Sequence, residues 1–255
     1  GIDNVAVGAS AGDAVTTGSD NTLIGDNAGG AITTGITSVA VGSAALLLAT
    51  TGARNVAVGY QALDAATTAD NNTAIGAEAL GANTSGTQNV AVGTYTLDAN
   101  TTATNNTGMG YNALTANSTG SGNSAFGQSA LEANTTASNN VAVGAEALKA
   151  NTTGTDNVAV GSNAADANTT GADNTAIGDN ALGANITGSY NTAIGSDALL
   201  LNTASENTAV GQGALDANST GVKNVAMSNG ALGANTTGDF NVGLGYRALN
   251  ANTTA

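Results

Sequence analysis

Residues 72–88 read NTAIGAEALGANTSGTQ, and this 17-residue unit decides the fold because it recurs along the whole chain. Asn opens every unit except one, where Ser38 stands instead. The units begin at residues 4, 21, 38, 55, 72, 89, 106, 123, 140, 157, 174, 191, 207, 224 and 241. Each step is 17 residues, except the step of 16 from Asn191 to Asn207. We therefore interpret residues 1–255 as a single array of 15 repeats, the last truncated.

The consensus unit is N-[VT]-A-[VI]-G-x-x-A-L-x-A-N-T-T-G-x-x, and we call equivalent positions a column, numbered from the Asn. Columns 2 and 4 are mostly β-branched or apolar with a small residue between them, which is typical of a strand. The Gly of column 5 indicates a turn with positive φ. A four-residue A-L-x-A piece is too short to nucleate a helix. We therefore predict an all-β parallel β-solenoid of 17-residue coils, about 15 in number and stacked at about 4.8 Å.

Composition removes several function classes. The chain has no His, Cys, Pro or Trp, and only 4 basic against 18 acidic residues, for a net charge of −14. Without imidazole or thiol groups there is no imidazole base, no thiolate nucleophile and no soft-metal site, and we expect neither an enzyme nor a cofactor. Four scattered cations do not suit nucleic acid. The longest apolar run, residues 44–49, is far shorter than the roughly 20 residues of a membrane span, so we expect no membrane insertion.

Repetition places like residues above one another. We expect the column-1 amides to form a structural ladder that bonds coil to coil, rather than a ligand site. The central members of this Asn ladder are Asn55, Asn72, Asn89, Asn106, Asn123, Asn140, Asn157 and Asn174. A second Asn column, column 12, runs from Asn83 to Asn252.

Column 9 is Leu in twelve repeats, next to an Ala column. Adjacent residues of a straight strand point to opposite faces, so one of these columns is expected to face outward unless a bend turns both inward. An outward Leu column would be a self-association surface in a homotrimer or a filament. Its candidate members are Leu63, Leu80, Leu97, Leu114, Leu131 and Leu148.

Acidic residues of neighbouring repeats share column 17 at two places, Asp3 with Asp20 and Asp156 with Asp173, and such a pair could hold a cation. Asp156 and Asp173 are neighbours in column 17 and form a candidate Ca²⁺ pair. The alternative is two solvated carboxylates on a turn.

Two segments carry a resemblance to known repeats. Asn55–Leu63 reads NVAVGYQAL and Asn241–Leu249 reads NVGLGYRAL. These segments resemble repeats of phage tail fibres and bacterial surface fibres, and are more loosely similar to the head repeats of trimeric autotransporter adhesins, whose unit is shorter. The resemblance implies an extracellular, cell-surface or virion location and trimeric winding. The ends, Gly1 and a final unit broken off in mid-repeat, suggest a slice of a longer array, or alternatively head-to-tail stacking.

The sequence leaves two functions open. The first is a structural, non-catalytic shaft or head module of a fibre, whose partners are copies of itself and, if it is adhesive, a cell-surface glycan or host receptor. The second is ice binding by a flat Thr ladder in column 13. The candidate ice-binding residues are Thr16, Thr33, Thr50, Thr67, Thr101, Thr135, Thr152 and Thr169.

Overall fold

The computed structural model describes residues 1–254 and confirms the parallel β-solenoid. Each repeat contributes one strand of three residues, and no helix occurs in the described part of the chain. The fifteen strands are β1 Val5–Val7, β2 Thr22–Ile24, β3 Val39–Val41, β4 Val56–Val58, β5 Thr73–Ile75, β6 Val90–Val92, β7 Thr107–Met109, β8 Ser124–Phe126, β9 Val141–Val143, β10 Val158–Val160, β11 Thr175–Ile177, β12 Thr192–Ile194, β13 Thr208–Val210, β14 Val225–Met227 and β15 Val242–Leu244.

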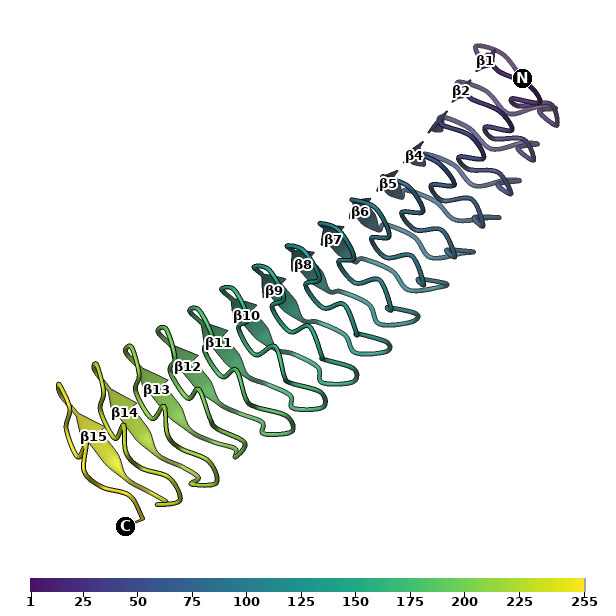
Figure 1. Ribbon diagram of the computed structural model, residues 1–255. Helices are drawn as coiled ribbons and strands as arrows, with labels where there is room; N and C mark the ends of the chain where they lie inside the picture. Colours follow the sequence, from purple (N-terminus) through teal and green to yellow (C-terminus); the bar gives the residue numbers. More distant parts are fainter. Residues whose placement is uncertain (255) are drawn as a thin grey trace. The chain divides into compact units, whose positions relative to one another are not determined.

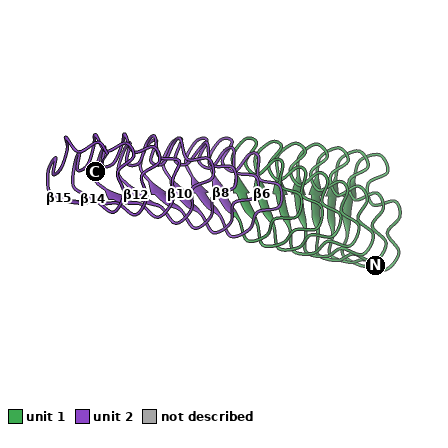
Figure 2. Ribbon diagram, turned by 90° about the horizontal axis from the view of Figure 1, so that it is seen from below, with its two compact units in different colours: residues 1–123 green, residues 124–255 purple. Residues whose placement is uncertain are grey.

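The chain divides into two compact units, Gly1–Asn123 and Ser124–Ala255 (Figure 2). Strands β1–β7 belong to the first unit and β8–β15 to the second, and within each unit neighbouring coils place their strands side by side (Figure 1). Pairing is parallel and in register, so that Val158, Ala159 and Val160 face Thr175, Ala176 and Ile177. Equivalent columns therefore stack directly within each unit.

The strand alternates as a period of two requires. The middle residue of a strand such as β10, Ala159, is fully buried, whereas Val158 and Val160 are partly exposed. Column 3 therefore faces the interior and columns 2 and 4 face outward. Because Ala is small, the coil can be thin. In a coil that follows the consensus, such as residues 140–156, the interior is filled by the Ala of columns 3 and 8, the Leu of column 9 and the Asn of columns 1 and 12.

The turn after the strand needs glycine. Gly161 has φ of +139°, and a Cβ built on it would lie 2.4 Å from the carbonyl oxygen of Gly178 in the next coil. The expected positive-φ turn is therefore confirmed, and the close approach of two coils adds a second reason for Gly. Ser228, the exception in this column, adopts φ of +107°.

The prediction of an outward Leu column is wrong. All six candidates are buried with 0% exposure, namely Leu63, Leu80, Leu97, Leu114, Leu131 and Leu148. Each has φ between 51° and 55°, which is the left-handed region. This conformation bends the chain, so that Ala147 and Leu148 both face the interior. The alternation argument fails because it holds only for an extended segment.

Side-chain volume is exchanged between columns where the consensus breaks. Gly12 and Gly29 replace the column-9 Leu in the first two repeats, while Leu23 replaces the column-3 Ala. A Cβ on Gly12 or on Gly29 would lie 2.6 or 2.7 Å from a Leu23 methyl carbon, so the Leu of β2 fills the space that both glycines leave. Thr96 and Gly108 form a second exchange of this kind, with 2.6 Å between a Gly108 Cβ and Thr96 Cγ2. The interior is thus close-packed despite its small residues.

Candidate functional site

The Asn ladder uses both ends of each buried amide. The backbone N–H of Asn157 donates to Asn140 Oδ1 at 3.0 Å, and Asn157 Nδ2 donates to the same oxygen at 3.2 Å. Asn157 Nδ2 also donates to the carbonyl oxygen of Gly171 at 2.8 Å. Each amide therefore links its own coil to the preceding one and closes its own coil. The coil-to-coil bonding predicted for column 1 is confirmed, and the whole predicted set from Asn55 to Asn174 is buried.

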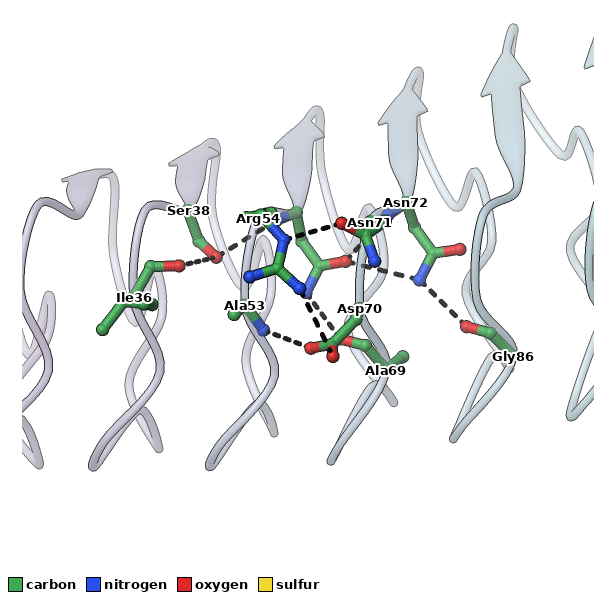
Figure 3. Close-up of polar contacts among 10 residues, drawn as sticks. Ile36, Ser38, Ala53, Arg54, Ala69, Asp70, Asn71, Asn72 and Gly86 are labelled. Atoms are coloured by element: carbon green, nitrogen blue, oxygen red, sulfur yellow. Dashed lines mark hydrogen bonds and ion pairs between the residues drawn. The ribbon is translucent and has the colours of Figure 1, made fainter.

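Ser38 shows what the ladder loses without the amide (Figure 3). Its backbone N–H still donates to Asn21 Oδ1 at 3.0 Å, and its Oγ accepts from the N–H of Asn55 at 3.2 Å. The Ser38 hydroxyl donates back to Ile36 at 3.3 Å, whereas the amide of Asn55 reaches forward to the carbonyl oxygen of Ala69 at 2.7 Å. The hydroxyl therefore preserves the contact between coils but does not close its own coil.

The second Asn column joins the first at one carbonyl group. Asn168 Nδ2 donates to Asn151 Oδ1 in the preceding coil at 2.8 Å and to the carbonyl oxygen of Gly171 at 3.0 Å. That carbonyl oxygen also accepts from Asn157. The side-chain oxygens of Asn157 and Asn168 in turn accept from the Asn residues of the following coil. Both Asn columns therefore bond the same turn. Because the amides of Asn157 and Asn168 are paired within the chain, we interpret the two ladders as structural and not as a ligand site.

The short coil interrupts the second ladder. Asn202 Nδ2 donates to the carbonyl oxygen of Ala204 at 2.8 Å, so Ala204 takes the place of the column-15 Gly and the residue of column 14 is missing. In residues 1–254, Asn185 Oδ1 is the one buried side-chain acceptor without a hydrogen-bond partner. Strand register survives, since Thr192 still faces Thr208. The deletion therefore changes only the turn, and its cost is the hydrogen bond that Asn185 Oδ1 would otherwise accept in the second Asn ladder.

Inserting one Thr between Thr203 and Ala204 is expected to stabilise the chain. The insertion restores the 17-residue spacing and allows Asn202 to donate to Asn185 Oδ1, which removes a desolvation penalty of about 1–3 kcal/mol. Urea denaturation followed by circular dichroism measures the change. The control is the same Thr inserted between Thr187 and Gly188, in a coil of normal length, which should destabilise. Equal effects at the two sites would contradict this explanation.

The predicted ice-binding Thr ladder is occupied by coil-to-coil bonds. Thr152 Oγ1 donates to the carbonyl oxygen of Thr169 at 3.0 Å, and Thr169 Oγ1 donates to the carbonyl oxygen of Ile186 at 3.0 Å. The other candidates do the same at 3.0–3.2 Å; they are Thr16, Thr33, Thr50, Thr67, Thr101 and Thr135. Their hydroxyl protons point along the stack of coils, so column 13 does not present a free row of donors to water.

The predicted cation pair consists of exposed turn residues. Asp156 and Asp173 both have positive φ, and Asp156 Oδ1 accepts from Asn139 Nδ2 at 3.1 Å. Within residues 1–254 no group of three or more His, Cys, Asp or Glu side chains is placed to hold a metal ion. We therefore assign no metal site to this pair.

Carboxylates gather on a different surface, formed by columns 7 and 10. Asp98 and Asp64 both lie over Gly81, since a Cβ there would be 2.7 Å from Asp98 Oδ1 and 3.7 Å from Asp64 Oδ1. Partial burial raises the pKa of Asp98, and the charges of Glu78 and Asp64 raise it further. Burial also raises the pKa of Asp64, although backbone hydrogen bonds oppose this effect. The absence of a side chain on Gly81 therefore brings like charges together.

Stability is expected to increase as the pH falls. The folded-state pKa of Asp98 lies above its ordinary value of 3.8, so the folded chain binds its proton more tightly than the unfolded chain does. This contribution to stability is complete below pH 3.8 and is lost as the pH rises through the raised pKa. Asp98→Asn should therefore raise Tm at pH 7 and leave it unchanged at pH 3. Asp13→Asn, exposed in the same column, is the control; an equal gain from both would contradict the burial argument.

A surface hollow lies beside Asp216 and Arg247, where Gly213, Gly230 and Gly233 leave out three side chains. Burial raises the pKa of Asp216. The hollow is open and polar, and its charged groups do not include the pair of opposed carboxylates that glycoside cleavage requires. We assign no reaction to it.

Comparison with known proteins identifies no relative. No family model matches this chain, and neither a curated protein nor a solved structure matches it. The likeness to fibre repeats therefore depends on the repeat motif alone, and function has to be argued from the geometry of the coils. No helix able to cross a membrane is present among the described residues.

Proposed function

We propose that this chain is a structural, non-catalytic module of a fibre that is exposed on a cell surface or a virion. The observation that carries the proposal is the bonding between coils. Neighbouring coils of a unit bond to one another through strand pairing, the Asn ladder and most of the column-13 hydroxyls, as Val158, Asn157 and Thr152 illustrate. These bonds recur along each unit, so they suit a part that has to resist pulling and proteolysis.

Function in such a module is carried by the whole array. The structure of a solenoid is stabilised by contacts between neighbouring repeats, so extra coils lengthen it without a new fold. The second unit alone repeats the same column-1 bond from Asn140 to Asn241. A protein that only needs to bind a small ligand gains nothing from such regularity, whereas a spacer gains length with each coil.

The turns offer a surface for adhesion. Tyr60, Tyr95, Tyr111 and Tyr246 are exposed in the turn after the strand, and the rings of Tyr95 and Tyr111 lie 6.2 Å apart in an edge-on arrangement. Exposed aromatic rings are suited to stacking on sugar rings. We propose that a cell-surface glycan, where one is bound, is held by these turns.

Ice binding by column 13 is the weaker hypothesis, because its hydroxyl protons are used within the chain. Its direct test is thermal hysteresis. A substantial hysteresis activity that is abolished by Thr152→Val and Thr169→Val would favour it over the fibre.

The fibre proposal is tested by locating the chain in its source. Antibodies against the purified chain, detected with gold in electron micrographs of intact cells and particles, should label filaments or spikes along their length. The same antibodies pre-absorbed with the chain are the control. Label confined to the interior of intact cells would overturn the proposal.

A further inference from the structure

We propose that the outward side of the strands is the surface on which a second copy of this chain packs. We call this surface the sheet face and define it as the residues of columns 2 and 4, one pair per strand from Val5 and Val7 to Val242 and Leu244. The inference rests on the self-associating fibre proposed above, and it replaces the Leu column as the surface responsible.

The sheet face exposes large apolar side chains at regular intervals. Column 4 stays open to solvent even where strands flank it on both sides. Eight such residues are exposed by 37–45%: Ile24, Ile75, Met109, Phe126, Val143, Ile177, Ile194 and Met227. The column-4 residues between them are partly exposed Val residues, namely Val41, Val58, Val92, Val160 and Val210. A row of exposed and partly exposed apolar side chains within a unit marks a contact site.

The distribution of polar residues indicates that column 4 is a contact surface. Column 4 contains only Val, Ile, Met, Phe and Leu in all 15 repeats. Column 2, on the same face, accepts Thr six times and Ser once. Yet column 2 is the less exposed of the two in most strands, as the pattern of β11 shows. If exposure to water decided the residues, the more exposed column 4 would contain more polar residues than column 2. Strand propensity does not explain the absence of Thr from column 4, because Thr also favours strands. The more exposed column is the strictly apolar one, as expected if a partner covers it.

Charge also selects this face for contact between copies. None of the 22 charged residues falls in columns 1 to 5. Two chains that each carry a net charge of −14 repel one another over most of their surface. The sheet face is where two copies can approach without placing like charges opposite one another.

A second copy fits this face because it has the same spacing. Side chains recur once per coil, about 4.8 Å apart, and another chain of the same repeat presents ridges at the same interval. Three-residue strands at that spacing offer, summed over both units, about 700 Å² per copy. Two copies that pack face to face along both units would bury about 1,400 Å² in total, which is the size of a stable interface.

The proposal is tested by measuring self-association of matched charge variants. The double variant Val143→Lys with Ile177→Lys places two charges on the sheet face. The control, Thr153→Lys with Thr187→Lys, places two equal charges on an exposed turn of the same unit. Sedimentation equilibrium over a range of concentrations gives each dissociation constant, and circular dichroism verifies folding. A third variant, Val143→Thr with Ile177→Thr, retains β-branched residues and replaces the Lys variant if that does not fold.

We expect the wild-type chain to form dimers or larger assemblies. The sheet-face variants should raise the dissociation constant at least about tenfold, and the turn variant should change it less than about twofold. A wild-type chain that stays monomeric at about 200 μM overturns the inference, as does equal weakening by both Lys variants. Binding of monomeric wild type to ice or to phosphatidylcholine vesicles, lost in the sheet-face variants, also overturns it. Gold labelling of fibres would stand in either case, so the two failures are distinguishable.

Discussion

Gly161→Ala is expected to lower the free energy of unfolding by roughly 3–5 kcal/mol. Two costs add up at this position. The backbone has φ of +139°, which an L side chain rarely adopts, and the new Cβ would lie 2.4 Å from the carbonyl oxygen of Gly178. Because that oxygen belongs to the backbone of the next coil, it cannot move without disturbing the stacking. Urea denaturation followed by circular dichroism measures the loss.

Gly245→Ala separates the two costs. Gly245 occupies the same column in the coil of β15, with φ of +119°, but no atom lies within 4 Å of the position that a Cβ would take there. The substitution should therefore cost only the backbone strain of about 1–3 kcal/mol. Equal losses at Gly161 and Gly245 would show that the close approach of coils contributes nothing.

Leu148→Ala is expected to cost about 2–5 kcal/mol, the loss measured when a fully buried Leu is truncated. Leu148 is 0% exposed, and a thin interior built mainly from Ala has few large side chains that can move into the space. The left-handed backbone is unfavourable for Leu and Ala alike, so it does not account for the difference. Thermal and urea denaturation give the change in stability.

Leu201→Ala is the matched control, since Leu201 is 53% exposed in a turn of the same unit. Its truncation should alter stability by less than about 0.5 kcal/mol. Sedimentation measurements on both variants add a second test of side-chain placement. If Leu148→Ala left stability intact but weakened self-association, the Leu column would face outward after all.

The repeat can be recognised from the amino-acid sequence alone. Seventeen residues are too few for a strand and a helix with their connections, and the recurrence of Asn55, Asn72 and Asn89 dictates one coil per unit. The strand at columns 2 to 4, the glycine turn and the coil-to-coil amides follow from local chemistry, because period-two alternation and positive φ are properties of short segments. The Ala of column 3 also indicates the sheet face. If the small residue of the strand faces the interior, the Val and Ile on either side of it have to point outward.

Whether a turn residue points to the interior or to solvent depends on the assembled coil. Leu148 lies inside because its left-handed φ, unfavourable in isolation, is offset by burial against neighbouring coils. Leu23 compensates Gly12 and Gly29, residues of its own and the preceding repeat, and the unpaired Asn185 Oδ1 results from a deletion near Ala204 in the next coil.

The sequence by itself therefore determined the repeat length, the strand, the glycine turn and the identity of the ladders, since each depends on a few consecutive residues or on simple recurrence. Only the tertiary structure decided that Leu148 is core while Ile177 is surface, because burial depends on the path of the whole coil and on the coils stacked beside it.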